Sequence, residues 1–307
     1  MSKGKIMVIG SLNMDLVVNV PYMPKVGETI LGYGFKTIPG GKGANQAFAA
    51  SKLGGEVYML GKVGTDEYGQ MEVESLKSAG VNAQSIEKQA GMHTGLAFIY
   101  VNDEGDNNIV VVPGANSMCS KEYIDRHRPL MGECDIIILQ LEIPFETVSY
   151  AVELAKQMNK TVILNPAPAP DRIPENILEK VDIITPNETE LQKITRHETN
   201  SLEDIRKAAN IILSKGVKTV IVTWGDQGAV LVTENECTHY PVQKVKVVDT
   251  TAAGDSFTAA VAVALSEKRN LGEAIAFANK VASIVVTREG AQTSIPRRDE
   301  VEKASDA

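Results

Sequence analysis

A run of small residues that ends in an aspartate stands late in the sequence. Residues 249–255 (DTTAAGD) follow a predicted strand and open a long apolar helix. Small residues allow the backbone to approach a ligand closely, and the free N–H groups at a helix start bind anions such as phosphate. Asp255, in the first turn, could then take a proton from an attacking hydroxyl. A helix cap, or a partner of the helix dipole, is the alternative interpretation of the same spacing.

Two polar segments among the first 45 residues carry side chains that can recognise hydroxyl groups. Residues 39–45 (PGGKGAN) enter a helix through glycines and include Lys42 and Asn45. The Walker A pattern G-x-x-x-x-G-K-[ST] is absent from the chain, and a tight turn would also explain the glycines. Asn13 and Asp15 come just past the first predicted strand, and α/β folds bind ligands at the carboxyl ends of strands. Both residue types also form ordinary turns.

Two further segments lie directly after predicted strands. In residues 185–190 (TPNETE), Asn187 and Glu190 are three apart and share one face of a starting helix. Their oxygens could organise a hydrated Mg²⁺, or the pair could form a capping box. Residues 223–228 (TWGDQG) form a glycine-punctuated loop between two strands, which could wrap a nucleotide or simply reverse the chain.

An α/β framework has to position these segments. Short apolar runs predict strands at residues 5–10, 16–20, 56–60, 96–100, 108–112, 136–139, 161–164, 182–184, 219–222, 229–233 and 242–248. Helices are predicted at residues 40–53, 68–79, 147–158, 188–194, 201–215, 251–265 and 271–286. A polar turn at 102–106 predicts a hairpin. The β-α alternation after residue 113 indicates a mostly parallel sheet flanked by helices, in one α/β domain of residues 1–307 with a small β appendage.

Composition argues against several classes of protein. Hydrophobic residues make up 43% of the chain and charged residues 23%, as in soluble globular proteins. A formal net charge of -8 argues against a nucleic-acid-binding surface. The three cysteines are scattered and the four histidines lack ligand or triad spacing, so we expect neither a disulfide framework nor a zinc site. No signal-peptide pattern or membrane-spanning apolar run is found, so a cytoplasmic location is expected.

Taken in order, these motifs resemble the ribokinase (PfkB-type) family of carbohydrate kinases over nearly the whole chain. The two family signatures match residues 40–45 and 249–255, at opposite ends of the sequence. The wider family usually has glycine where this chain has Ala253, and ribokinases often have alanine there. Residues 13–15, 140–142 (QLE), 164–168 (LNPAP) and 288–292 (REGAQ) are also similar to ribokinases.

The resemblance implies a role for each matching residue. It makes Asp255 the catalytic base, beside an anion hole formed by the backbone N–H groups of Ala252, Ala253 and Gly254. The residues implied for the sugar site are Asn13, Asp15, Gly41, Lys42, Gly43, Asn45, Glu142 and Asp255. Those implied for ATP are Asn187, Thr223, Gly225, Asp226, Gln227, Gly228, Gly254 and Asn279, with Glu190 helping to organise Mg²⁺. A monovalent cation site for K⁺ is implied at Asp249, Thr251, Val285, Arg288, Gly290 and Ser294.

The same resemblance implies a ribokinase-like fold and an activity. The small β-sheet, contributed by residues of about 14–38 and 95–112, would be a lid that excludes water and joins two copies of the chain in a homodimer. The reaction implied is transfer of the γ-phosphoryl group of ATP to the primary hydroxyl of D-ribose, giving ribose 5-phosphate, with no nucleic-acid or membrane partner.

Other functions compete with this interpretation. A kinase of the same family could act on deoxyribose, fructose or a nucleoside. A dinucleotide-dependent oxidoreductase is disfavoured because no G-x-G-x-x-G follows the first strand. A non-catalytic sugar-binding regulator with the same fold is disfavoured by Gly254 and Asp255, which such a protein would not need.

Overall fold

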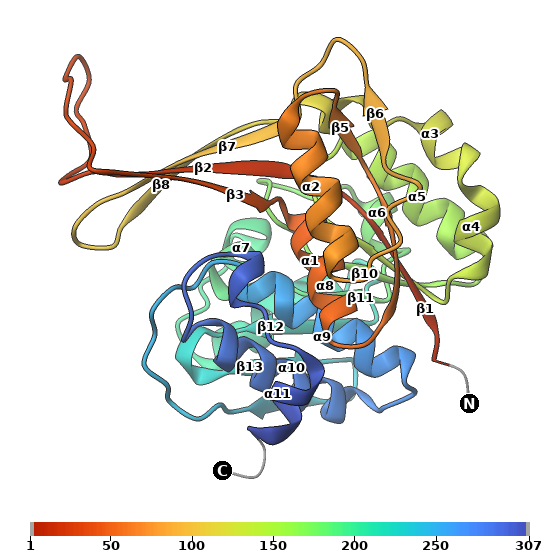
Figure 1. The fold of residues 1–307 in the computed structure, drawn as a ribbon. Coiled ribbons are helices and arrows are strands. Elements are labelled where there is room, and N and C mark those ends of the chain that lie inside the picture. The colour runs from red at the N-terminus through yellow and green to blue at the C-terminus, as the bar shows by residue number, and fades with distance from the viewer. Residues whose placement is uncertain (1–2, 305–307) are drawn as a thin grey trace.

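An eight-stranded sheet forms the centre of the molecule in the computed structural model, which describes residues 3–304 (Figure 1). Its strands follow the order β14-β13-β12-β11-β10-β9-β1-β4. They are β1 (Lys5–Ile9), β4 (Glu56–Leu60), β9 (Ile136–Leu139), β10 (Thr161–Leu164), β11 (Ile183–Ile184), β12 (Thr219–Thr223), β13 (Ala229–Val232) and β14 (Cys237–Tyr240). All pairs from β12 to β4 are parallel, whereas β13 and β14 pair antiparallel. This confirms the predicted mostly parallel sheet.

Helices cover both faces of this sheet, because its inner strands are apolar on both sides. In β1, Ile6 and Val8 belong to one hydrophobic core, and Met7 and Ile9 belong to the other. The first core is closed by α1 (Lys42–Lys52), α2 (Glu67–Ser78), α9 (Ala253–Ser266), α10 (Leu271–Val285) and α11 (Arg298–Lys303). The second is closed by α3 (Lys121–Arg126), α4 (Arg128–Glu133), α5 (Phe145–Gln157), α6 (Glu175–Leu178), α7 (Glu188–Thr195) and α8 (Leu202–Leu213).

A second sheet projects from the body of the molecule (Figure 1). Its order is β3-β2-β7-β8, formed by β2 (Asn13–Asn19), β3 (Gly34–Gly40), β7 (Gly95–Val101) and β8 (Asn107–Val112). β2 pairs antiparallel with β3 and parallel with β7. The predicted hairpin at 102–106 joins β7 to β8, and its turn is closed by the Asn102 Oδ1 atom, which accepts from the N–H groups of Glu104 and Asp106.

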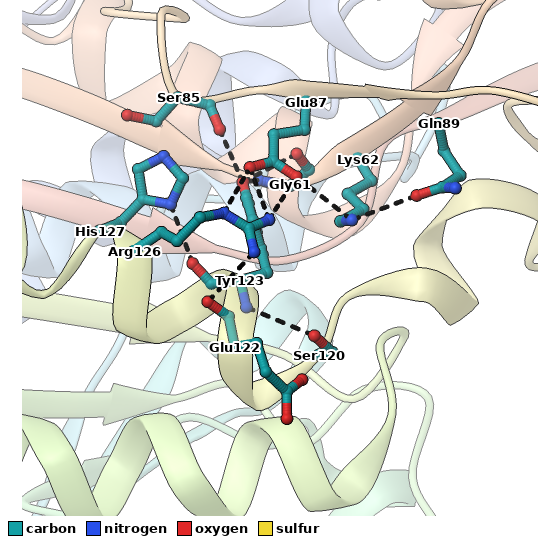
Figure 2. Close-up of polar contacts among 10 residues, drawn as sticks. All are labelled: Gly61, Lys62, Ser85, Glu87, Gln89, Ser120, Glu122, Tyr123, Arg126 and His127. Atoms are coloured by element: carbon teal, nitrogen blue, oxygen red, sulfur yellow. Dashed lines mark hydrogen bonds and ion pairs between the residues drawn. The ribbon is translucent and has the colours of Figure 1, made fainter.

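A polar cluster fastens a two-stranded sheet, β5 (Lys62–Gly64) with β6 (Glu87–Gln89), to α3. Glu87 lies between the Lys62 ammonium and the Arg126 guanidinium, at N–O distances of 3.2 and 2.8 Å (Figure 2). The Tyr123 hydroxyl beside them accepts from the Gly61 N–H at 2.7 Å. The Lys62 side chain is only 9% exposed, and its ammonium is paired with the Glu87 carboxylate, as a buried charge has to be. We assign this cluster a structural role.

The predicted strand at 242–248 is wrong. The edge strand β14, which sequence reasoning missed, ends at Tyr240, and the described residues offer the following segment no neighbouring strand. Its alternating valines are instead exposed, Val245 by 41% and Val247 by 55%. Because a strand needs a neighbouring strand for its backbone hydrogen bonds, this segment does not form one.

The ordinary turn that was the alternative interpretation of Asn13 and Asp15 is not formed. They do not lie in a turn past β1, because β2 of the second sheet begins at Asn13.

No helix among residues 3–304 combines the length and apolarity that crossing a bilayer requires.

Candidate active site

A cleft of about 670 Å³ opens beside the N-terminus of α9. It is of the size that small-molecule sites have. Twelve of the residues singled out from the sequence line it: Lys42, Asn187, Glu190, Thr223, Gly225, Asp226, Gly228, Ala252, Ala253, Gly254, Asp255 and Asn279. Gln227 is not in the lining, and its side chain donates to the Asp226 carboxylate at 2.8 Å. The exposed segment 242–248 forms one wall through Val242, Lys244 and Val247, among others.

The start of α9 presents its backbone to this cleft. Ala252, the N-cap, has a left-handed conformation with φ 59°, and no side chain of the described residues caps the helix. The Ala253 N–H donates to the Thr250 carbonyl at 3.2 Å, whereas the N–H groups of Gly254 and Asp255 have no acceptor within the described part of the chain. A Cβ atom at Gly254 would project into open space, so glycine leaves room for a ligand. The arrangement suits an anion close to the backbone.

Asp255 is buried, with 8% of its surface exposed, and its carboxylate is held by two amides of α1. Gln46 donates to Oδ1 at 2.9 Å and Asn45 donates to Oδ2 at 3.2 Å. Within residues 3–304 the carboxylate accepts nothing from the N–H groups of its own helix, so it does not act as a cap. Burial raises the pKa of Asp255, although the Lys42 charge and the two amide bonds oppose the shift.

Lys42 is the cation at the centre of the site. Burial alone would lower its pKa, but nearby carboxylates raise it above its usual value. These are the carboxylates of Asp255, Glu142, Glu190 and Asp15. One ammonium therefore faces several carboxylates, which hold it in its charged form.

Asp15 and Asn13 reach the site from β2. Glu142 Oε2 accepts from Ser11 Oγ at 2.5 Å, from Asn13 Nδ2 at 3.3 Å and from the backbone N–H of Lys42 at 3.2 Å. Burial of Asp15, followed by the charges of Glu142 and Asp255, raises its pKa from 3.8 to about 7. Burial beside two other carboxylates thus brings the pKa of this carboxyl group close to neutral pH.

A glycine allows these elements to meet. Gly41 has φ 84°, and a Cβ atom there would lie 2.6 Å from the Asn13 backbone nitrogen. A side chain at this position would separate α1 from β2. Gly43 is packed in the same way against the backbone of Ser11.

The opposite end of the cleft is made by two loops in contact. The Thr223 N–H donates to the Pro186 carbonyl at 3.0 Å, which joins the loop 223–228 to the start of α7. Asn187 and Glu190 form the capping box that was one of the two alternatives, with N···O distances of 2.7 and 2.9 Å. Both also line the cleft, as does Asn279, whose amide donates to the Tyr240 carbonyl at 2.9 Å.

The segments predicted to hold a monovalent cation also meet. The Asp249 carboxylate accepts from the Thr251 N–H at 2.9 Å and from the Gly290 N–H at 2.8 Å. Burial would raise the pKa of Asp249, but these bonds lower it below its usual range, so the group is ionised at neutral pH. Ser294 and Val285 are buried, and Arg288 pairs with Glu300 at 2.7 Å.

Comparison with known proteins identifies the family. The family model described as pfkB family carbohydrate kinase matches residues 3–298. The chain belongs to the pfkB family of carbohydrate kinases. It is 38% identical to a ribokinase of Haemophilus influenzae, over 95% of each chain, and 40% identical to a deoxyribokinase of Salmonella typhi, also over 95% of each. The structure of Arabidopsis thaliana ribokinase complexed with ribose and ATP is similar with a TM-score of 0.93 and 35% identity, over 98% of each chain.

In this carbohydrate kinase, sequence reasoning missed the residues that hold the site in place. Gln46, Gln140 and Asn165 form buried amide contacts behind Asp255. Asn116 holds Asn13, donating to its Oδ1 atom at 2.7 Å. Gln140 and Asn165 stand in segments that we quoted only for their resemblance, and that resemblance was the signal that could have indicated them.

Proposed function

We propose that this carbohydrate kinase transfers the γ-phosphoryl group of ATP to the primary hydroxyl of D-ribose. The observation that supports this most is Asp255, a buried carboxylate at the start of α9. Within the described residues it caps no helix, and the N–H groups of Gly254 and Asp255 beside it have no acceptor. A base next to an anion site is what transfer from a phosphate to a hydroxyl requires. Ribokinases at 38% identity, and the similar structure that holds ribose and ATP, favour ribose.

In the proposed reaction, Asp255 removes the proton of the sugar hydroxyl as its oxygen bonds to the γ-phosphorus. The bond from that phosphorus to the bridging oxygen of ATP breaks, which leaves ADP and ribose 5-phosphate. The N–H groups at the start of α9 donate to the phosphoryl oxygens, where negative charge is concentrated. Lys42 supplies a positive charge near the carboxylate.

The residues proposed to surround the sugar are those that lie around Lys42 and Asp255. They are Asn13, Asp15, Gly41, Gly43, Asn45 and Glu142. Asp15 and Glu142 offer acceptors for sugar hydroxyls, and Asn13 and Asn45 offer donors. Asn45 has a buried Oδ1 atom without a partner in the described residues, so it can also accept from a hydroxyl. This polar set suits a small polyhydroxylated sugar.

ATP is proposed to occupy the cleft, with its phosphates at α9 and its base between the loop 223–228 and Asn279. The valines of segment 242–248 give this end an apolar wall for an adenine ring. Bound Mg²⁺ would neutralise charge on the phosphates. Within residues 3–304, no three acidic, histidine or cysteine side chains gather to hold a metal ion, so the phosphates would supply most of its ligands and Glu190 could hold one of its waters.

The test is ADP release with ribose, 2-deoxyribose, fructose and adenosine as acceptors. We expect the highest kcat/KM with ribose. Because a deoxyribokinase is 40% identical, deoxyribose is the second candidate, and a higher kcat/KM with deoxyribose would replace ribose by it. Release of no ADP with any acceptor would contradict the kinase activity and favour a sugar-binding regulator.

We also propose activation by K⁺ at the loops joined by Asp249. The ionised Asp249 carboxylate joins the two segments through the N–H groups of Thr251 and Gly290. A large monovalent cation would bind beside it, held by backbone carbonyls of the residues named in the sequence analysis. The ion would order the turn that leads into α9. We expect a higher kcat in K⁺ than in Na⁺ at equal ionic strength, and equal rates in the two salts would contradict the proposal.

The second sheet is proposed to act as a lid and as a dimer interface. By strand register, Leu16, Val18, Phe35, Phe98 and Val110 share one face, and Asp15 lies on the other. One face would thus cover the sugar, while the apolar face would pack against a second copy of the chain. Phe35 is 64% exposed and Val110 58% exposed, which is costly for a sheet that stays alone in water.

Val110→Asp is therefore expected to convert a dimer into a monomer in sedimentation velocity at micromolar concentration. Ile109→Asp is the matched control, because Ile109 is similarly exposed at 53% but points to the opposite face of β8. A wild-type monomer, or a dimer that survives Val110→Asp, would contradict the proposed interface.

A further inference from the structure

A chain of buried amides ends on the Asp255 carboxylate. Gln140 Nε2 donates to Gln46 Oε1 at 2.5 Å, and Gln46 Nε2 donates to Asp255 Oδ1 at 2.9 Å. Gln46 and Gln140 are fully buried. Gln46 comes from α1 and Gln140 from the end of β9, so two separate elements meet behind a single carboxylate of α9.

The amides of Gln46 and Asn165 are each held in one orientation by their contacts. The second N–H of Gln46 goes to Asn165 Oδ1 at 3.1 Å, and Asn165 Nδ2 donates to the Thr185 carbonyl at 2.9 Å. A carboxylate only accepts, so a rotated Gln46 amide would set its oxygen against Asp255 and lose the donor from Gln140. The contacts thus select the orientation in which Gln46 donates to the base.

We propose that Gln46, oriented by Gln140, is a positioning residue that holds Asp255 Oδ1 and directs Oδ2 toward the sugar hydroxyl. This inference rests on the proposed function, in which Asp255 is the base. Asn45, the other donor to Asp255, belongs to the proposed sugar site, and a sugar hydroxyl can replace it at Oδ2. Gln46 has no such exchange available, because both its N–H groups and its oxygen are already engaged.

The surrounding charges explain why the base needs this donor. The groups that act on the Asp255 carboxylate are one cation, Lys42 of α1, and three carboxylates from other elements, those of Asp15, Glu142 and Glu190. Burial and the carboxylates favour a protonated Asp255, which could not accept the hydroxyl proton. Lys42 and the amide donors oppose them, so loss of Gln46 would raise the pKa of Asp255 further.

The experiment compares kcat against pH for the wild type, Gln46→Met and Gln140→Met. Methionine fills a similar volume without a donor. We expect the acidic limb of the Gln46→Met profile to move to higher pH by roughly one unit. At pH values on this limb kcat should fall about tenfold, and at higher pH, where Asp255 is ionised in both proteins, the loss should be smaller. Gln140→Met should shift the limb in the same direction but less, since it acts through Gln46.

The control is Thr147→Val, which removes a buried hydrogen bond to the Cys119 carbonyl on the far side of the sheet. It should lower Tm without moving the limb. If Gln46 served packing alone, Gln46→Met would behave like this control, and an unmoved limb would overturn the proposal. If Gln46→Met does not fold, an unmoved limb in Gln140→Met overturns it instead. A wild type that releases no ADP would contradict the kinase activity itself, which is a distinct result.

Discussion

Asp255→Asn is expected to lower kcat by about 10²–10⁴-fold, while ATP and ribose still bind. Asparagine keeps the shape of the side chain and loses its basicity. The wild-type carboxylate accepts from Gln46 and Asn45. The new amide oxygen can accept from Gln46. Once the Asn45 amide rotates, the new amide N–H can donate to Asn45 Oδ1, a buried acceptor with no partner among the described residues. The variant should therefore fold normally.

Three measurements on this variant separate a base from a structural residue. These are kcat, the affinity for each substrate, and Tm. Because the buried carboxylate has a raised pKa, its charge at neutral pH costs stability, so Tm should stay level or rise in the variant. A folded Asp255→Asn protein with near-normal turnover would contradict the proposed base.

Asp15→Asn is expected to raise the ribose KM roughly ten- to one-hundred-fold, because a carboxylate that accepts from sugar hydroxyls makes charge-assisted bonds. The KM for ATP should change little, since Asp15 is not in the lining of the cleft. In the wild type, ribose affinity should improve as pH rises through about 7, the pKa of Asp15, since only the ionised group accepts fully. The variant should lose this dependence.

The same pKa also predicts how stability depends on pH. The affinity for ribose should rise with pH, whereas the free energy of unfolding should fall. The folded-state pKa of Asp15, about 7, lies above its ordinary value of 3.8. Its contribution to the free energy of unfolding is therefore fully present below pH 4 and is lost as pH rises to about 7. Urea unfolding of Asp15→Asn should lack this part of the pH dependence. A variant with unchanged ribose affinity and unchanged pH dependence would contradict the assignment of Asp15.

Local signals in the sequence were enough for the framework and the reactive centre. Short apolar strands alternating with helices predict a parallel sheet, because each strand is buried on both faces and each helix needs a sheet to cover. The small residues before Asp255 mark a helix start that can approach a phosphate. These features depend on residues that are close together in the chain, so composition and spacing are enough to predict them.

Long-range pairing was decided by the tertiary structure alone. The donor to the Asp255 carboxylate, Gln46, lies 209 positions away, and no periodicity in either segment indicates the contact. Residues 242–248 have the alternation of a strand but find no partner strand among residues 3–304, and they form a wall of the cleft instead. The pKa values of Asp15 and Asp255 likewise depend on burial and on charges brought in by other elements, neither of which a sequence pattern contains.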